Sequence, residues 1–140
     1  MNPGKGIVAG FIATVAISVL MIVKAFSHRL SAFNTIEIIH RLLGGPLVTG
    51  WIGHFVIGSL IWGVLFAVFY RRLPGGYAVV RGLVFGVYAW LAMMLLFLPV
   101  GGIGFFGVAI GWPVVGFTLA IHLVYGAVLG ASYGSMTGQR

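Results

Sequence analysis

The stretch LVTGWIGHFVIGSLIWGVLFAVFY, residues 47–70, contains no Asp, Glu, Lys or Arg. A helix needs about 17–25 mostly apolar residues to cross the hydrocarbon core of a bilayer, so this stretch predicts a transmembrane helix. Comparable apolar runs occupy residues 6–23, 82–100 and 105–134. We therefore predict an all-α membrane protein whose four transmembrane helices form a single domain over residues 1–140.

The composition of the chain excludes most other classes of protein. Hydrophobic residues make up 61% and charged residues 6%, which is too little polar surface to keep a globule in solution. The net charge of +7 comes from Lys and Arg residues that flank the apolar runs instead of forming one face, so we expect no nucleic-acid binding. Glu37 is the only acidic residue and there is no cysteine. The chain therefore lacks carboxylate pairs and thiols, and we expect no enzyme activity.

The Lys and Arg residues in the loops predict the orientation of the chain. Four spans place both termini on one side of the membrane, and cytoplasmic loops carry an excess of Lys and Arg. The side with the termini carries Lys5, Arg71, Arg72, Arg81 and Arg140. The opposite side carries Lys24, Arg29 and Arg41. We therefore expect both termini in the cytoplasm.

Residues 34–46 predict a short interfacial helix between the first two spans. Asn34 and Glu37 have the spacing of a capping box, in which both side chains satisfy free amides at a helix start. Glu37 and Arg41 are four residues apart and can pair on the polar face, and Gly44-Gly45-Pro46 ends the helix. The apolar positions at helical spacing are Ile36, Ile39, Leu42 and Leu43. Two interpretations stay open: a connector lying flat at the headgroups, and a lid or docking surface.

Two pairs of similar segments predict an internal duplication. Lys5-Gly-Ile-Val-Ala-Gly10 matches Arg81-Gly-Leu-Val-Phe-Gly86, and His54-Phe-Val-Ile-Gly58 matches His122-Leu-Val-Tyr-Gly126. The first and third spans run in the same direction, so the repeat would be parallel, with its axis along the membrane normal. We expect a duplicated helical hairpin that closes into a four-helix bundle.

Glycines at four-residue spacing predict where the helices approach one another. Such spacing clears one helix face of side chains and lets two backbones meet closely in lipid. The glycines expected at helix contacts are Gly6, Gly10, Gly58, Gly82, Gly86, Gly126, Gly130 and Gly134. The contacts can lie within the bundle or, if one glycine face stays exposed, between copies of the chain.

His54 and His122 are the candidate site residues. An ionisable side chain inside a span is costly and normally faces the bundle interior. The duplication puts both histidines at one depth, where two imidazoles could ligate a haem b between the second and fourth spans, with Gly58 and Gly126 making room for the macrocycle. The competing interpretation is a structural or proton-relay role. We expect no other metal site, because a metal would need more ligands than this pair offers.

The sequence resembles a family of small four-helix bacterial membrane proteins to which no activity is assigned. The resemblance covers nearly the whole chain and rests on four segments: Lys5-Gly-Ile-Val-Ala-Gly10, Trp51-Ile-Gly-His54-Phe-Val-Ile-Gly58, Leu73-Pro-Gly-Gly76 and His122-Leu-Val-Tyr-Gly126. It implies a multi-pass protein of the bacterial inner membrane.

Three functions are consistent with these features. The first is a non-catalytic accessory or assembly subunit of a larger membrane complex, for which a respiratory complex is one candidate. The partners of such a subunit would be the lipid bilayer and other membrane subunits or a second copy of the chain. The second is a small b-type cytochrome with His54 and His122 as ligands. The third is an oligomeric transporter or channel for small solutes.

Overall fold

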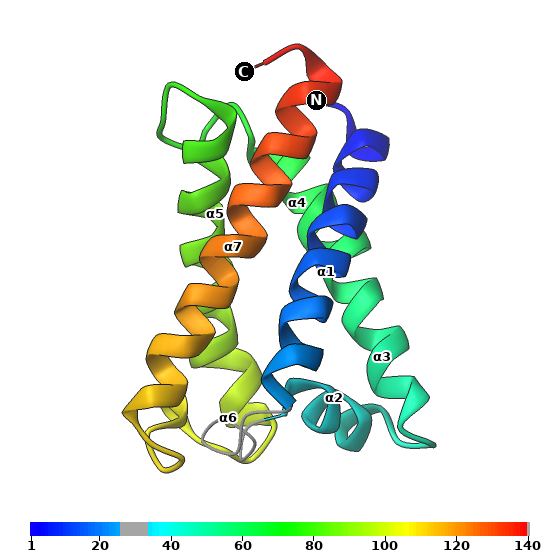
Figure 1. Ribbon diagram of the computed structural model, residues 1–140, viewed down its shortest axis with the longest axis vertical. Helices are drawn as coiled ribbons and strands as arrows, with labels where there is room; N and C mark the ends of the chain where they lie inside the picture. Colours follow the sequence, from blue (N-terminus) through cyan, green and yellow to red (C-terminus); the bar gives the residue numbers. More distant parts are fainter. Residues whose placement is uncertain (26–33, 140) are drawn as a thin grey trace.

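The computed structural model describes residues 1–25 and 34–139 and forms a bundle of helices (Figure 1). Four segments are long and apolar enough to cross a membrane, and no strand occurs in these two ranges. The all-α fold with four membrane-capable helices is therefore confirmed. The four segments are α1 (Pro3–Ala25), then α3 (Val48–Phe55) with η1 (Val56–Trp62) and α4 (Gly63–Phe69), then α5 (Ala78–Ala92) with η2 (Met93–Phe97) and α6 (Leu98–Val100), and finally α7 (Trp112–Thr137).

The start of the fourth span differs most from the sequence-based prediction. We expected a helix from residue 105, but α7 begins at Trp112. Phe106 has a φ of 57° and Gly111 a φ of 123°, and neither value is compatible with a continuous right-handed helix. Residues Phe105–Gly107 form only a short 3₁₀ turn, η3. The apolar run therefore contains a loop before the membrane-spanning helix starts.

The first and third spans also begin earlier than predicted, at Pro3 and Ala78. The side-chain Oδ1 of Asn2 accepts a hydrogen bond from the backbone N–H of Lys5 at 3.1 Å. This bond satisfies one of the free amides at the helix start, so α1 gains its extra turn from a polar cap that lies outside the apolar run.

The short helix after the first span is confirmed as α2 (Thr35–Leu43). The Oδ1 atom of Asn34 accepts hydrogen bonds from the backbone N–H groups of Ile36, at 3.0 Å, and Glu37, at 3.4 Å. The Glu37 carboxylate does not complete the capping box, because it accepts from Nε of Arg41 at 3.0 Å. Gly44, with a φ of 73°, ends the helix.

The buried face of α2 is shifted from the predicted one. Ile36 and Ile39 are buried as expected, and Ile38 is buried with them. Leu42 and Leu43 are instead exposed. The shift arises because α2 packs against both α3 and the loop end of the bundle, so residues on two adjacent faces meet protein.

The four spans pack as two hairpins that meet along α1 and α7. The second span, α3–η1–α4, packs against α1, and α5 packs along α7. In Figure 1, α5 and α3 lie at the two flanks, and the hairpins splay apart toward the end where α2 lies. The second and third spans therefore leave space between them at that end.

Backbone contacts between glycines hold the second hairpin together. A Cβ atom placed on Gly82 would overlap the carbonyl oxygen of Gly126 and lie 2.9 Å from the Cα of Gly130. A Cβ atom on Gly86 would overlap the carbonyl oxygen of His122. Since nothing larger than hydrogen fits, α5 and α7 approach to backbone contact. Gly134 lies at the end of this contact, against Ala78 and Gln139.

The first hairpin packs through glycines in the same way, with one addition. Gly6 faces the backbone of Gly63, and Gly10 faces Gly58 and Gly63. Gly63 follows Gly58 by five residues, whereas Gly130 follows Gly126 by four. The π-helical segment η1 contains Gly58 and ends directly before Gly63, and a π turn accommodates one extra residue. Both glycines therefore face α1. The symmetry that relates the two hairpins stays a prediction.

An aromatic cluster fills the end of the bundle that carries the termini. The ring centroid of Phe66 lies 5.4 Å from that of Tyr70, 5.2 Å from that of Phe85 and 5.5 Å from that of Tyr133. These rings come from α4, α5 and α7, and from the residue after α4. They join the two hairpins where the glycine contacts of α1 and α5 begin.

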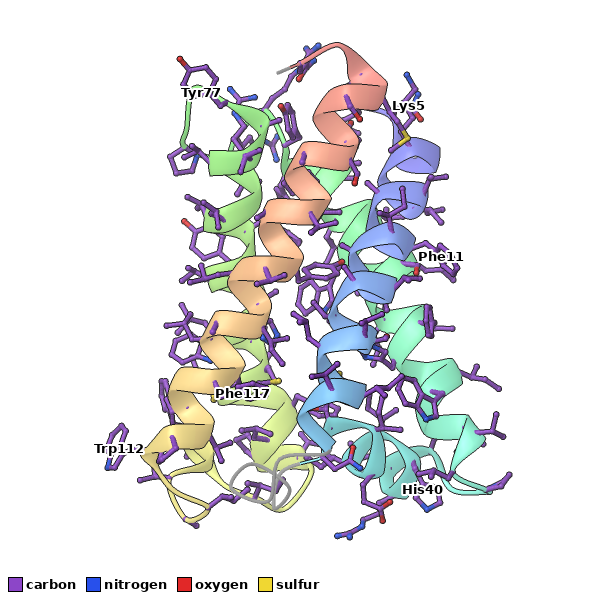
Figure 2. All side chains as sticks on the ribbon, viewed as in Figure 1. Lys5, Phe11, His40, Tyr77, Trp112 and Phe117 are labelled. Carbon is purple, nitrogen blue, oxygen red and sulfur yellow. The ribbon has the colours of Figure 1, made fainter. Side chains whose placement is uncertain are left out.

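Basic residues surround the same end. Figure 2 shows Lys5 and Tyr77 at this end and His40 and Trp112 at the other. The Lys5 ammonium donates to the carbonyl of Met136, and the guanidinium of Arg81 lies 4.8 Å from the centroid of the Tyr70 ring. Arg71 and Arg72 directly follow Tyr70 in the chain. The residues His28, Arg29 and Arg140 lie outside the described ranges, so the sides of the membrane expected for Arg29 and Arg140 stay predictions.

We predict that Gly126→Ala destabilises the protein by about 1–3 kcal/mol, because the new methyl group would collide with the backbone of Gly82. The matched control is Gly116→Ala in the same helix, where a Cβ atom meets nothing within 4 Å. This control should be neutral or stabilising by up to about 1 kcal/mol, because alanine favours the helix. Unfolding of both variants in detergent measures the difference. Equal stability of the two variants would contradict the glycine contact.

Candidate functional site

A cavity of about 740 Å³ lies between the two hairpins. All four spans and α2 contribute to its wall, and most lining side chains are apolar. On each span, the lining residues lie in the half nearer α2. In the first hairpin these halves are the C-terminal half of α1 and the α3–η1 segment. In the second hairpin they are the residues from Ala89 to Val100 and the N-terminal half of α7. A volume of this size is in the range of small-molecule sites.

The cavity is closed toward the termini by the aromatic cluster. Tyr125 lies at the boundary, because it lines the cavity and also belongs to the buried cluster with Phe66 and Phe85. At the other end, Ile36 and Ile39 of α2 contribute to the wall. The wall of this cavity, called the chamber below, therefore comes from the half of the bundle nearer α2.

His54 and His122 line this same cavity. They come from α3 and α7, one from each hairpin. The structure thus brings the two sequence-predicted site residues to one chamber. Their rings are held by different neighbours.

His54 is held by a hydroxyl of the neighbouring helix. Its Nε2 atom lies 3.1 Å from Oγ of Ser18 on α1, and both side chains are buried. The Ser18 hydroxyl donates to the carbonyl of Thr14 at 2.7 Å. The ring also makes edge contacts with Trp51 and Phe55, with centroids 5.9 Å and 5.7 Å away. These contacts fix the imidazole at the wall of the cavity.

His122 is held by its own helix. Its Nδ1 atom lies 2.8 Å from the carbonyl oxygen of Thr118, one turn earlier in α7. The hydroxyl of Thr118 donates to the carbonyl of Val114 and accepts from Nε1 of Trp90 at 3.2 Å. The side chain of Trp90 thereby connects α5 to the turn of α7 that carries the histidine.

The two π-helical segments both line the cavity. Ile57, Gly58 and Trp62 come from η1, and Met93, Leu96 and Phe97 come from η2. A π turn shifts the backbone hydrogen-bond register, and such turns are frequent at functional sites. The hydroxyl of Tyr125 donates to the carbonyl of Gly58 at 2.6 Å, which gives this carbonyl in η1 a partner from the opposite hairpin.

Gly58 and Gly126 both lie at helix contacts, and Gly58 also lines the cavity. A Cβ atom on Gly58 would overlap the side chain of Thr14, and one on Gly126 would overlap the backbone of Gly82. Both glycines serve helix contact within their own hairpins. The volume beside the histidines instead arises from the splay of the hairpins, with side chains such as Ala89 and Ala92 at its wall.

Several functional neighbours were missed by the sequence reasoning. Thr14 and Ser18 lie four residues apart in an otherwise apolar run, and that spacing could have marked a polar face on α1. Thr118 precedes His122 by one turn and could have been paired with it in the same way. Among residues 1–25 and 34–139, no group of three or more His, Cys, Asp or Glu side chains could hold a metal ion.

The fold and the cavity define a multi-pass membrane protein of four spanning helices. The profile of a family of unknown function, DUF6789, matches residues 1–140, so the chain belongs to this family. No curated protein and no solved structure matches the chain.

We predict that Tyr125→Phe destabilises the protein by about 1 kcal/mol, because the carbonyl of Gly58 loses its partner in the bundle interior. The matched control is Tyr88→Phe on α5, whose side chain is 53% exposed and should tolerate loss of the hydroxyl. Detergent unfolding curves of both variants provide the measurement. A Tyr125 variant as stable as the Tyr88 variant would show that the hydrogen bond contributes nothing.

Proposed function

We propose that this chain is a non-catalytic membrane protein that binds a small apolar molecule in the cavity between its hairpins. The observation that carries the proposal is the chamber of about 740 Å³, which is closed by aromatic rings at one end and lined by apolar residues with a few polar atoms. Binding sites for small molecules have this composition, because apolar walls supply affinity and a few polar groups orient the ligand.

Two further features support a ligand over simple packing. The π turns of η1 and η2 both lie at the chamber wall, although a π turn is less favourable than regular helix and needs a compensating reason. Two histidines also lie in the wall of this apolar chamber, and ionisable residues inside a membrane are costly and commonly functional.

The cavity proposal is tested with 1-methoxynaphthalene as an apolar probe, using the protein in lipid nanodiscs. Trp51 and Trp62 line the chamber, so a bound probe should quench tryptophan emission in a saturable way. We expect Ala92→Phe to weaken this quenching, because the added ring takes up space in the chamber. The matched control, Val15→Phe on the exposed face of α1, should leave it unchanged. Non-saturable quenching that is equal in all three proteins would reflect partition into lipid and would overturn the proposal.

A haem b held by His54 and His122 is the second candidate, because both histidines line one chamber. His122 fits this role, since Nδ1 binds a backbone carbonyl and Nε2 stays available. His54 fits less well, because its Nε2 atom is engaged by Ser18. We therefore place the apolar ligand first and expect the purified protein to be colourless. A reduced-minus-oxidised visible spectrum with a Soret band that disappears in His122→Ala would favour the cytochrome.

The role of accessory or assembly subunit in a larger membrane complex is compatible with a ligand-binding bundle. Its glycine faces are used within the bundle, so a partner subunit or a second copy would have to meet the lipid-facing side chains, such as Phe11 (Figure 2). Companions at fixed stoichiometry after gentle purification would support this role. A transporter would need a path past the aromatic cluster, and flux into liposomes would be its signature.

For the orientation, we propose that the chain lies in a bacterial inner membrane with its termini in the cytoplasm. The end with the termini carries Lys5, Arg71, Arg72 and Arg81. Because cytoplasmic loops of membrane proteins carry an excess of Lys and Arg, this charge supports a cytoplasmic location of the termini. The chain has no cysteine, so single cysteines can report the two sides. In intact cells, a membrane-impermeant maleimide should label Phe105→Cys and leave Tyr77→Cys unlabelled until lysis, both sites being exposed. The reverse pattern would place the termini outside.

A further inference from the structure

The hydrogen bonds of the two cavity histidines settle which nitrogen of each ring carries the proton. A carbonyl oxygen only accepts, so Nδ1 of His122, 2.8 Å from the Thr118 carbonyl, carries hydrogen. In a neutral imidazole the other nitrogen then holds a lone pair. Nε2 of His122 is therefore a hydrogen-bond acceptor.

The same reasoning applies to His54 through Ser18. A serine hydroxyl has one hydrogen, and that of Ser18 is donated to the Thr14 carbonyl at 2.7 Å. With its hydrogen on that carbonyl, the Ser18 oxygen accepts from Nε2 of His54, 3.1 Å away. Nε2 carries the proton, and Nδ1 of His54 is left as the acceptor.

Both rings are neutral because nothing in the chamber can balance a positive charge. Glu37 is the only carboxylate side chain in the sequence, and it pairs with Arg41 on the surface of α2. An unpaired imidazolium inside the membrane would be costly. Each hairpin thus contributes one neutral acceptor nitrogen, and neither nitrogen has a hydrogen-bond partner within the described ranges.

The hydroxyls of Ser18, Thr118 and Tyr125 cannot serve these acceptors, because their hydrogens are already donated. Tyr125 donates to Gly58, and Thr118 donates to the backbone of its own helix. The indole N–H groups of Trp51 and Trp62, which belong to the cavity wall, have no acceptor among residues 1–25 and 34–139. A hydroxyl group both donates and accepts, so it can meet a histidine nitrogen and an indole N–H together.

We infer that the cavity selects a hydroxylated apolar molecule, an alcohol or phenol on a hydrocarbon body, with its hydroxyl donating to Nδ1 of His54 or Nε2 of His122. This inference rests on the proposed function and names the ligand class of the same cavity. A ketone, quinone or ether has only acceptor oxygens, so it could accept from an indole N–H but would leave both histidine lone pairs without a hydrogen. The hydrocarbon body is common to all these classes, and the hydroxyl therefore decides selectivity.

The test compares 1-naphthol with 1-methoxynaphthalene in nanodiscs, because the two probes share a ring system and differ in the hydroxyl hydrogen. Each affinity is expressed relative to the probe's partition into empty nanodiscs. We expect 1-naphthol to bind about tenfold more tightly, which corresponds to about 1.4 kcal/mol and one hydrogen bond. Replacing both histidines, in His54→Phe with His122→Phe, should reduce the preference to about one while the ether still binds.

Each outcome separates this inference from the proposed function. Equal affinities in the unmodified protein would overturn the hydroxyl preference and leave the apolar cavity standing. Absence of saturable binding by both probes would overturn the cavity proposal and the inference with it. If the double histidine variant fails to fold, the single variants His54→Phe and His122→Phe serve instead, and the naphthol preference should fall in the variant that lacks the accepting nitrogen while ether binding is kept. An unchanged preference in the folded double variant, or in both folded single variants, would contradict the role of the histidines.

Discussion

Contact between glycine backbones within each hairpin is the constraint on which the bundle depends. Lipid offers helices no hydrophobic reason to associate, so van der Waals contact and interhelical hydrogen bonds must hold them together. The contacts between Gly82 and Gly126, and between Gly6 and Gly63, place paired backbones against each other with no side chain between them. Each hairpin is therefore a tight unit, and the space in the molecule lies between the hairpins.

The two ends of the interface between the hairpins are filled differently. At the end with the termini, rings such as Phe66, Phe85 and Tyr133 occupy the space and exclude a ligand. At the opposite end the hairpins diverge, and α2 lies beside the opening (Figure 1). Close packing at one end and divergence at the other produce a chamber whose wall comes from the half of the bundle nearer α2.

Most buried hydroxyls inside this bundle follow the rule that membrane interiors impose, and Ser59 in η1 is an exception. With no water available, buried hydroxyls must find partners within the protein. Thr14, Ser18 and Thr118 each donate to a carbonyl one turn earlier in their own helices. The histidines are then oriented by Ser18 and Thr118, and their remaining nitrogens become the polar feature of an apolar chamber. The chamber wall thus offers acceptor nitrogens from the histidines beside the indole N–H groups of Trp51 and Trp62.

The amino-acid sequence by itself determined the four apolar helices, the Asn34 cap of α2 and the glycine spacing, because hydropathy and local hydrogen bonding act over neighbouring residues. It also singled out His54 and His122, since ionisable residues are conspicuous in apolar runs. Only the tertiary structure decided that Gly63 joins the glycine contact through a π turn and that Ser18 meets His54. The cavity and the late start of α7 at Trp112 were decided there too. These features depend on which helices become neighbours and at what angle, and helix packing is a property of the whole bundle that no single segment contains.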